Sequence, residues 1–228
     1  MFITKLLFYR WIGFFRRHTP LTIIALLAAC AEPYVHPSPG AQALPQIMES
    51  YALMDDGYQL PLSRWEAEGE ARAVLLSLHG FNDYSFAFDD LGRYLSRQGI
   101  TVIAYDQRGF GKTSGAGLWH GSERLSADLV AMTALLREQY AGVPLYLLGE
   151  SMGGAVLLTS LASAPLDVDG IVLLSPAVWS RSTMPYYQRF ARWVAVKTLP
   201  GVQLTGTGLD IHPSVELDMV RALGREGL

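Results

Sequence analysis

The hydrophobic positions of the chain follow two alternating patterns from about residue 51 to residue 177. Short continuous apolar runs, bounded by glycine, proline or polar residues, have the length of buried strands. They predict strands at Ala73–Leu78, Thr101–Tyr105, Pro144–Leu148 and Ile171–Leu174. Between these runs, apolar residues recur at helical spacing. Those segments predict helices at Phe86–Arg97, Arg124–Tyr140 and Met152–Ala164.

A hairpin is predicted ahead of these elements. Residues 51–54 and 58–68 are joined by Asp55-Asp56-Gly57, and an Asp-Gly pair favours a tight turn between two strands. Strands that then alternate with helices predict an α/β protein with a mostly parallel sheet and helices on both faces. In such sheets the chemistry gathers at the carboxyl ends of the strands. Three loops follow strand ends there, at His79–Ser85, Asp106–Ser114 and Gly149–Gly154.

The loop Gly149–Gly154 reads Gly-Glu-Ser-Met-Gly-Gly and lies between a predicted strand and a predicted helix. This is the context of a nucleophile elbow, in which a serine is held on a strained turn with its hydroxyl exposed. Gly149 and Gly153 leave room where strand and helix cross. Ser151 is therefore the predicted nucleophile, and the alternative is a tight turn that merely needs small residues.

The first loop supplies the expected partner for this serine. His79-Gly80 follows a strand end, where this kind of fold builds half of its oxyanion hole. We expect the backbone N–H groups of Phe81 and Met152 to hold the negative charge that develops on the substrate oxygen. His79 itself is predicted to bond within its loop, with a role as catalytic base as the weaker alternative.

The second loop contains a sequence that resembles a phosphate-binding loop, Gly111-Lys112-Thr113. That motif needs another glycine five residues before Gly111, and the position holds Asp106. The spacing excludes nucleotide binding. Asp106 and Arg108 are instead expected to bond backbone groups around the site.

Together, the three loop motifs resemble those of the lysophospholipase and monoacylglycerol lipase group of α/β hydrolases, which is also called serine aminopeptidase-like. The resemblance covers roughly residues 51–177. It implies an α/β-hydrolase fold, hydrolysis of lysophospholipid or monoacylglycerol esters, no cofactor or metal, and a mobile cap over the site. Aromatic residues after Ser180 are expected to begin the cap, unless they pack into the core.

The acid and the base of a catalytic triad are not found. In this fold the order is Ser, then an acid, then His. After Ser151 the only histidine is His212, and Asp210 is too close to it to occupy a separate strand end. Asp167 and Asp169 precede a strand, at the wrong edge of the sheet. We interpret the chain as a C-terminally truncated hydrolase with a partial cap and missing C-terminal strands.

Two alternatives to this interpretation stay open. One is a non-catalytic, membrane-tethered lipoprotein that retains the fold for binding. The other is an active site that uses His212 or His120 as an improvised base.

The first thirty residues are predicted to be a lipoprotein signal peptide. Residues 21–29 form an apolar run after Arg16 and Arg17 that is too short to span a bilayer. Residues 27–30, Leu-Ala-Ala-Cys, resemble a lipobox, and Cys30 is the only cysteine in the chain. A lipidated Cys30 predicts a membrane-anchored protein of the bacterial cell envelope that faces the periplasm or the exterior. A buried free cysteine in an apolar helix is the alternative.

Composition and charge further narrow the class of protein to which the chain can belong. The chain has 228 residues, of which 50% are hydrophobic and 17% are charged, which suits one folded domain. Residues 1–29 contain four bases and no acid, so residues 30–228 carry 14 bases against 21 acids, a net charge of −7. An acidic protein of this kind is a poor candidate for binding nucleic acid.

The predicted organisation has four parts, and no oligomeric state is predicted. They are a signal peptide at 1–30, a proline-containing tether at 31–48, a hydrolase core at 49–178 and a partial cap at 179–228.

Overall fold

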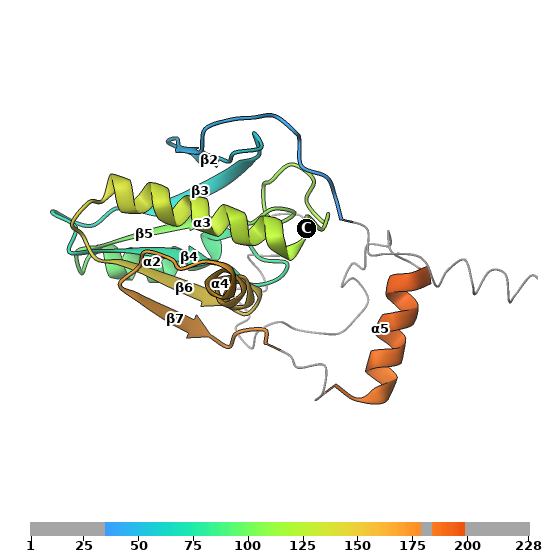
Figure 1. Ribbon diagram of the computed structural model, residues 1–228. Coiled ribbons are helices and arrows are strands. Elements are labelled where there is room, and N and C mark those ends of the chain that lie inside the picture. The colour runs from blue at the N-terminus through green and yellow to red at the C-terminus, as the bar shows by residue number, and fades with distance from the viewer. Residues whose placement is uncertain (1–34, 179–183, 199–228) are drawn as a thin grey trace, which may run out of the picture.

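The computed structural model describes residues 35–178 and 184–198. Residues 35–178 form one seven-stranded sheet flanked by helices, and residues 184–198 contain one further helix (Figure 1). The strands are β1 Gln46–Ile47, β2 Tyr51–Leu53, β3 Gln59–Trp65, β4 Ala73–Leu78, β5 Ile100–Tyr105, β6 Leu145–Glu150 and β7 Gly170–Leu174. The helices are the short 3-10 helix η1 Ser85–Phe88, α2 Asp89–Ser96, α3 Ser122–Gln139, α4 Met152–Ser163 and α5 Tyr186–Thr198.

The sheet has the order β1-β2-β3-β5-β4-β6-β7. Strands β5, β4, β6 and β7 are parallel, whereas β3 runs antiparallel to β5 and continues the antiparallel hairpin with β2. The predicted α/β fold with a mostly parallel sheet is thereby confirmed. The predicted strand Ala73–Leu78 matches β4 in both bounds, and the other predicted elements agree within a few residues.

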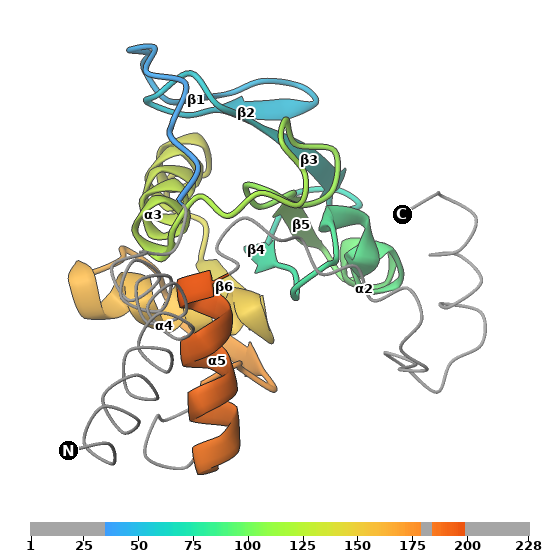
Figure 2. The same ribbon diagram turned by 90° about the vertical axis from the view of Figure 1, so that its right-hand side faces the viewer.

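Two apolar cores lie on opposite faces of the sheet. Helices α3 and α4 cover one face through a cluster that includes Leu129, Met132 and Leu157, all fully buried. Helix α2 covers the other face, together with Phe88. Figure 2 shows the sheet between α2 on one side and α3 with α4 on the other. Because both faces of the central strands are covered, these strands are continuous apolar runs, which is why the sequence predicted them so closely.

Part of the predicted tether contacts this body. Gln46 and Ile47 form β1, which pairs with β2, and the Ala43 N–H donates to the Asp55 carbonyl oxygen at 2.9 Å. The predicted signal peptide lies outside the described residues, as do residues 31–34 of the tether and most of the predicted cap.

Helix α5 is the described part of the predicted cap, and none of its side chains is buried. Its aromatic residues Tyr186, Tyr187, Phe190 and Trp193 are 53–85% exposed. They therefore do not pack into the core, which was the alternative for these aromatics. In the part of the chain that the structure describes, no helix is both long enough and apolar enough to cross a membrane.

Candidate active site

Ser151 has a strained backbone conformation at the junction between β6 and α4. Its φ is +47° and its ψ is −110°, in a region that residues other than glycine rarely adopt. The neighbouring chain holds it there. The Ser151 N–H donates to the Leu174 carbonyl oxygen at 2.9 Å, and the Ala177 N–H donates to the Ser151 carbonyl oxygen at 2.8 Å. This is the geometry of a nucleophile elbow.

The glycines around Ser151 are needed because strand and helix approach each other closely. A Cβ atom at Gly149 would lie 2.7 Å from the Gly154 Cα, and one at Gly153 would overlap the carbonyl oxygen of Leu78 at the end of β4. The alternative of a turn that simply prefers small residues does not account for the strained serine between them. The glycines make room for the strained turn, and the strained backbone sets the direction of the Ser151 side chain.

The first loop lies directly beside Ser151. A Cβ atom at Gly80 would be 3.5 Å from the Ser151 Cβ, so the backbone of this loop borders the space in front of the serine. Phe81 follows Gly80, with its ring 64% exposed and edge-on to Phe110 at 5.3 Å. Among residues 35–178 and 184–198, no hydrogen bond occupies the backbone N–H of Phe81 or of Met152. The Met152 N–H is thus available at the start of α4, next to Ser151, and the Phe81 N–H is available in the loop that borders the serine.

His79 is fully buried and fixes the first loop to the second. Its Nε2 atom accepts a hydrogen bond from the Gln107 N–H at 3.0 Å, so its Nδ1–H donates to the Gly80 carbonyl oxygen at 2.7 Å. The Gln107 side chain also donates to the His79 carbonyl oxygen at 2.8 Å. Burial lowers the pKa of His79, which favours the neutral ring. With both ring nitrogens engaged, His79 has the structural role predicted for it.

Asp106 is buried and binds backbone groups, as expected. Its two carboxylate oxygens accept from the Ser85 N–H at 2.7 Å and from the Lys112 N–H at 2.8 Å. Gly111 lies against this carboxylate, since a Cβ atom there would overlap it. Asp106 therefore closes its own loop and joins it to the start of η1.

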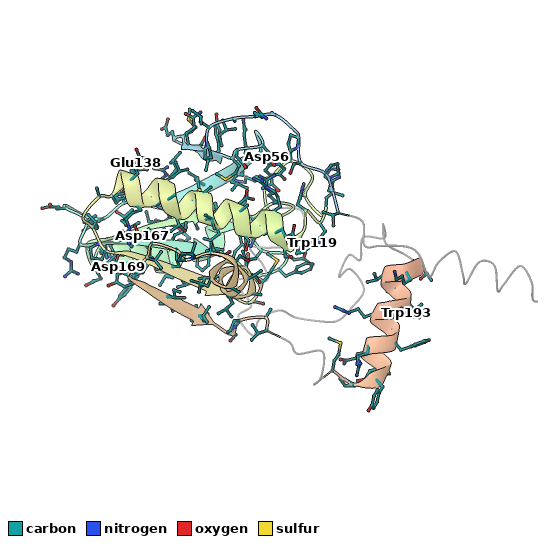
Figure 3. The ribbon with its side chains drawn as sticks, viewed as in Figure 1. Asp56, Trp119, Glu138, Asp167, Asp169 and Trp193 are labelled. Carbon is teal, nitrogen blue, oxygen red and sulfur yellow. The ribbon has the colours of Figure 1, made fainter. Side chains whose placement is uncertain are left out.

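The prediction for Arg108 was wrong. Arg108 is fully buried, and it binds carboxylates rather than backbone groups (Figure 3 labels Asp56). Its guanidinium donates to Asp56 at 2.6 and 2.7 Å and to Asp128 of α3 at 2.5 and 2.9 Å. Burial raises the pKa of Asp56, but hydrogen bonds from Arg108, Ser38 and the Tyr58 N–H, together with the charge of Arg108, outweigh it and hold this pKa well below its usual range. Arg108 thus ties the second loop to the hairpin turn and to α3.

An electrostatic effect between two carboxyl groups, those of Glu150 and Asp83, was not predicted. Glu150 directly precedes Ser151 and is partly buried. Burial raises the pKa of Glu150, and the carboxylate of Asp83 raises it further. Burial also raises the pKa of Asp83, in the first loop. The charge of Asp83 thus acts on Glu150, an effect between two loops that no local sequence pattern indicates.

The acid and base expected of a triad are not beside Ser151 in the described residues. Asp169 bonds to the Leu145 N–H at 2.8 Å, at the start of β6, whereas Ser151 follows the end of that strand. Arg137 pairs with both Asp167 and Asp169 at this opposite edge. These acids lie at the edge that the sequence indicated. Asp210 and His212 lie outside the described residues.

The remaining histidine candidate, His120, does not contact Ser151 either. Its ring is 5% exposed and packs edge-on to the rings of His36 and Tyr58, each at 5.2 Å. In the described part of the chain, no three His, Cys, Asp or Glu side chains form a group that could hold a metal ion.

A mostly parallel sheet with a strained serine between β6 and α4 defines an α/β hydrolase. Residues 69–226 match the family model described as "Serine aminopeptidase, S33", and the chain belongs to this family. The family resemblance inferred from the three loop motifs is thereby confirmed.

The curated relatives of the chain include lipases. It is 30% identical over 141 residues to "Monoglyceride lipase" of Homo sapiens, which covers 60% of this chain and 44% of the human protein. It is 34% identical over 119 residues to "Lipase LipV" of Mycobacterium tuberculosis, which covers 52% of this chain and 42% of that protein. The chain therefore spans less than half the length of these relatives.

Solved structures give the same fold. A soluble variant of monoglyceride lipase from Saccharomyces cerevisiae, in complex with a substrate analogue, superimposes with a TM-score of 0.57 at 26% identity. The match covers 77% of this chain and 60% of that chain. The monoacylglycerol lipase of Paleococcus ferrophilus has a TM-score of 0.55 at 23% identity, with 74% and 63% of the two chains covered.

Proposed function

We propose that the chain carries the nucleophile and the oxyanion hole of a serine ester hydrolase, and that its substrates are lysophospholipid or monoacylglycerol esters. The strained conformation of Ser151 at the start of α4 carries this proposal. Backbone strain of this kind persists only where the surroundings impose it, and it gathers at functional sites. The substrate class is supported by the relatives named as monoglyceride lipases.

The chemistry begins at the Ser151 hydroxyl oxygen, which attacks the carbonyl carbon of the ester. The carbonyl oxygen becomes an oxyanion and is held by the N–H groups of Phe81 and Met152. When the intermediate collapses, the ester C–O bond breaks and the alcohol leaves with a proton. Water then hydrolyses the acyl-enzyme, which releases a fatty acid and restores Ser151.

A base must take the proton of Ser151 and deliver it to the leaving alcohol, because an unassisted serine is a weak nucleophile. Neither His79 nor His120 has the geometry for this role. We infer that an acid and a histidine follow Ser151 in the family's chain order, in a part of the family fold beyond the described residues.

Labelling of the purified chain with a fluorophosphonate probe tests the proposal. An oxyanion hole alone retains about 1,000- to 10,000-fold catalysis over water when a triad member is missing, so we expect labelling even if it is slow. The Ser151→Ala variant should not be labelled. The Ser163→Ala variant is the matched control, because Ser163 lies on the same helix, is exposed and bonds only to Thr159 of that helix.

A membrane-tethered binding protein is the second candidate. It is favoured by one observation, namely that no histidine in the described residues contacts Ser151. Under this alternative, the folded wild-type chain would show no labelling that depends on Ser151. It would still bind a non-hydrolysable monoacylglycerol ether, which a fluorescence titration measures. That pair of results would overturn the hydrolase proposal.

We also propose that Cys30 is lipidated and anchors the protein to a membrane of the bacterial cell envelope. The lipobox-like residues 27–30, after a short apolar run and two arginines, support this proposal. The Cys30→Ser variant should appear in the soluble fraction of the native host, whereas Ser163→Ala should remain with the membranes. A Cys30→Ser variant that still sediments with membranes would rule out the lipid anchor.

A further inference from the structure

The segment that follows the predicted lipidation site is docked on the body. The His36 N–H donates to the Trp119 carbonyl oxygen at 2.7 Å, and the His36 ring meets the ring of His120. The Val35 side chain lies close to Gly121, because a Cβ atom at Gly121 would be 3.3 Å from it. With the bond from Ala43 and the pairing of β1 farther along, this segment is held at several points between residues 35 and 47.

The docking places residue 35 at the same edge of the sheet as Ser151. Gly121 directly precedes α3, which begins on the side where β5 ends. Ser151 follows β6, which is parallel to β4 and β5, so its position is also at the carboxyl edge. In Figure 1 the blue segment begins on the side toward which the arrowheads of β6 and β7 point.

The distance from the lipidation site to the docked segment is short. Five residue steps separate Cys30 from Val35, and a fully extended chain of this length reaches at most about 18 Å. The diameter of a domain of this size is larger than that. A lipid on Cys30 therefore holds the carboxyl edge, rather than the opposite edge, close to the bilayer.

The two edges also differ in their side chains. The carboxyl edge carries exposed apolar residues from separate segments, namely Phe81, Trp119 and Val178, which are 41–64% exposed. The opposite edge carries the ion pairs of Arg137 with Asp167 and Asp169. Figure 3 shows Trp119 at one end of the body formed by the sheet and helices α2 to α4, and Glu138, Asp167 and Asp169 at the other end of this body. Residues 30–228 are acidic overall, so apolar contact rather than charge attraction suits this edge to a lipid surface.

We propose that the docked segment orients the protein with the Ser151 edge against the bilayer that holds the Cys30 lipid, so that the site takes its ester from the membrane surface. This inference rests on the proposed lipidation and on the proposed hydrolase function. It adds an orientation, which neither of them specifies. The partner is a phospholipid bilayer, contacted through Phe81, Trp119 and Val178.

The two ends of α3 provide a matched pair of probe positions for the test. Trp119→Cys lies just before the helix, and Glu138→Cys lies near its end, and both native side chains are exposed. Each variant of the lipidated full chain is labelled with an environment-sensitive fluorophore and incorporated into phospholipid vesicles whose acyl chains carry a quencher. We expect strong quenching at position 119 and little at position 138. Equal quenching at both positions, or none at either, would overturn the orientation.

Two further measurements separate the possible failures. Flotation of the vesicles shows whether the protein is anchored. A protein that does not float with the vesicles would rule out the proposed lipid anchor. Fluorophosphonate labelling of Ser151 reports on the hydrolase function independently of both. Finally, a flexible insertion of about 20 Gly and Ser residues before Val35 adds roughly 25 Å of reach. It should abolish the difference between positions 119 and 138, and a difference that persists would show that the docked segment does not set the orientation.

Discussion

His79 and Gln107 are joined by two hydrogen bonds, one from the Gln107 backbone N–H to the imidazole Nε2 at 3.0 Å and one from the Gln107 side chain to the His79 carbonyl oxygen at 2.8 Å. Both residues are fully buried. Because His79 also binds the Gly80 carbonyl oxygen, this pair fixes the backbone that leads to Phe81. The proposed oxyanion hole therefore depends on a contact between two loops that are distant in sequence.

Replacing His79 by Ala should reduce both stability and reactivity. The change leaves the buried Gln107 N–H without a partner, which costs about 1–3 kcal/mol of unfolding free energy. It also frees the Phe81 N–H to move, and a displacement of about 1 Å can lower a rate by about 100-fold. Urea unfolding and the rate of fluorophosphonate labelling measure the two effects. Gln98→Ala, at an exposed position, should change neither. An unaltered labelling rate in a folded His79→Ala protein would contradict the positioning role.

Replacing Arg108 by Leu should destabilise the protein strongly. It removes the short ion pairs of Asp56 and Asp128 and leaves them only the longer contacts with Arg124, at 3.6 and 3.4 Å. Breaking a buried ion pair in this way costs about 3–5 kcal/mol. Arg93→Ala is the control, because the Arg93–Asp89 pair is exposed and such pairs contribute at most about 1 kcal/mol. Urea unfolding at pH 7.5 compares the two variants, and similar losses would contradict the structural role of Arg108.

Replacing Gly153 by Ala should disturb the elbow. The new methyl group would overlap the Leu78 carbonyl oxygen, so β4 and α4 must move apart, and overpacking of this kind costs about 1–3 kcal/mol. Because Ser151 directly precedes α4, we expect its labelling to be lost as well. Gly80→Ala is the matched control, because it adds the same methyl group at a position where its nearest neighbour would be 3.5 Å away. The unfolding free energy of the Gly80→Ala variant should stay close to that of the wild type. Equal stability of the two variants would contradict the close approach at Gly153.

The parts of the molecule that the sequence predicted are those with a local cause. Strand β4 was found in full because an apolar run lies between Arg72 and His79, and the elbow was found because its glycines are adjacent to the serine. The partners of Arg108 were missed because Asp56 is 52 residues away and Asp128 is 20 residues away. The effect of Asp83 on the pKa of Glu150 depends in the same way on residues that are far apart in the sequence.

The docked segment, too, could not be placed from the sequence alone. Its proline content indicates an extended chain, and composition says nothing about where such a chain lies. The contacts that fix it are backbone hydrogen bonds and ring packing from His36 and Ala43, which no hydrophobic pattern reveals.

Stability should fall as the pH decreases from 7.5 to 5.5, in part through His120. Burial lowers the pKa of His120, and the positive charge of Arg108 and the nearby His36 lower it further, against a smaller opposing effect from Asp56. A histidine with a lowered pKa binds fewer protons in the folded state than in the unfolded state. Its contribution to stability is therefore complete above the ordinary value of about 6.5 and is lost as the pH falls below it.

The His120→Phe variant isolates this contribution, because it keeps an aromatic ring between His36 and Tyr58 but cannot be protonated. Its unfolding free energy should decrease less between pH 7.5 and pH 5.5 than that of the wild type. Buried His79, whose pKa is also lowered, remains in both proteins, so part of the decrease should persist. Tyr94→Phe, at an exposed position, should keep the full pH dependence. His120→Phe and the wild type could also lose the same unfolding free energy over this range. That result would contradict the conclusion that His120 is buried and neutral in the folded protein, and its ring would have to be protonated beside Arg108.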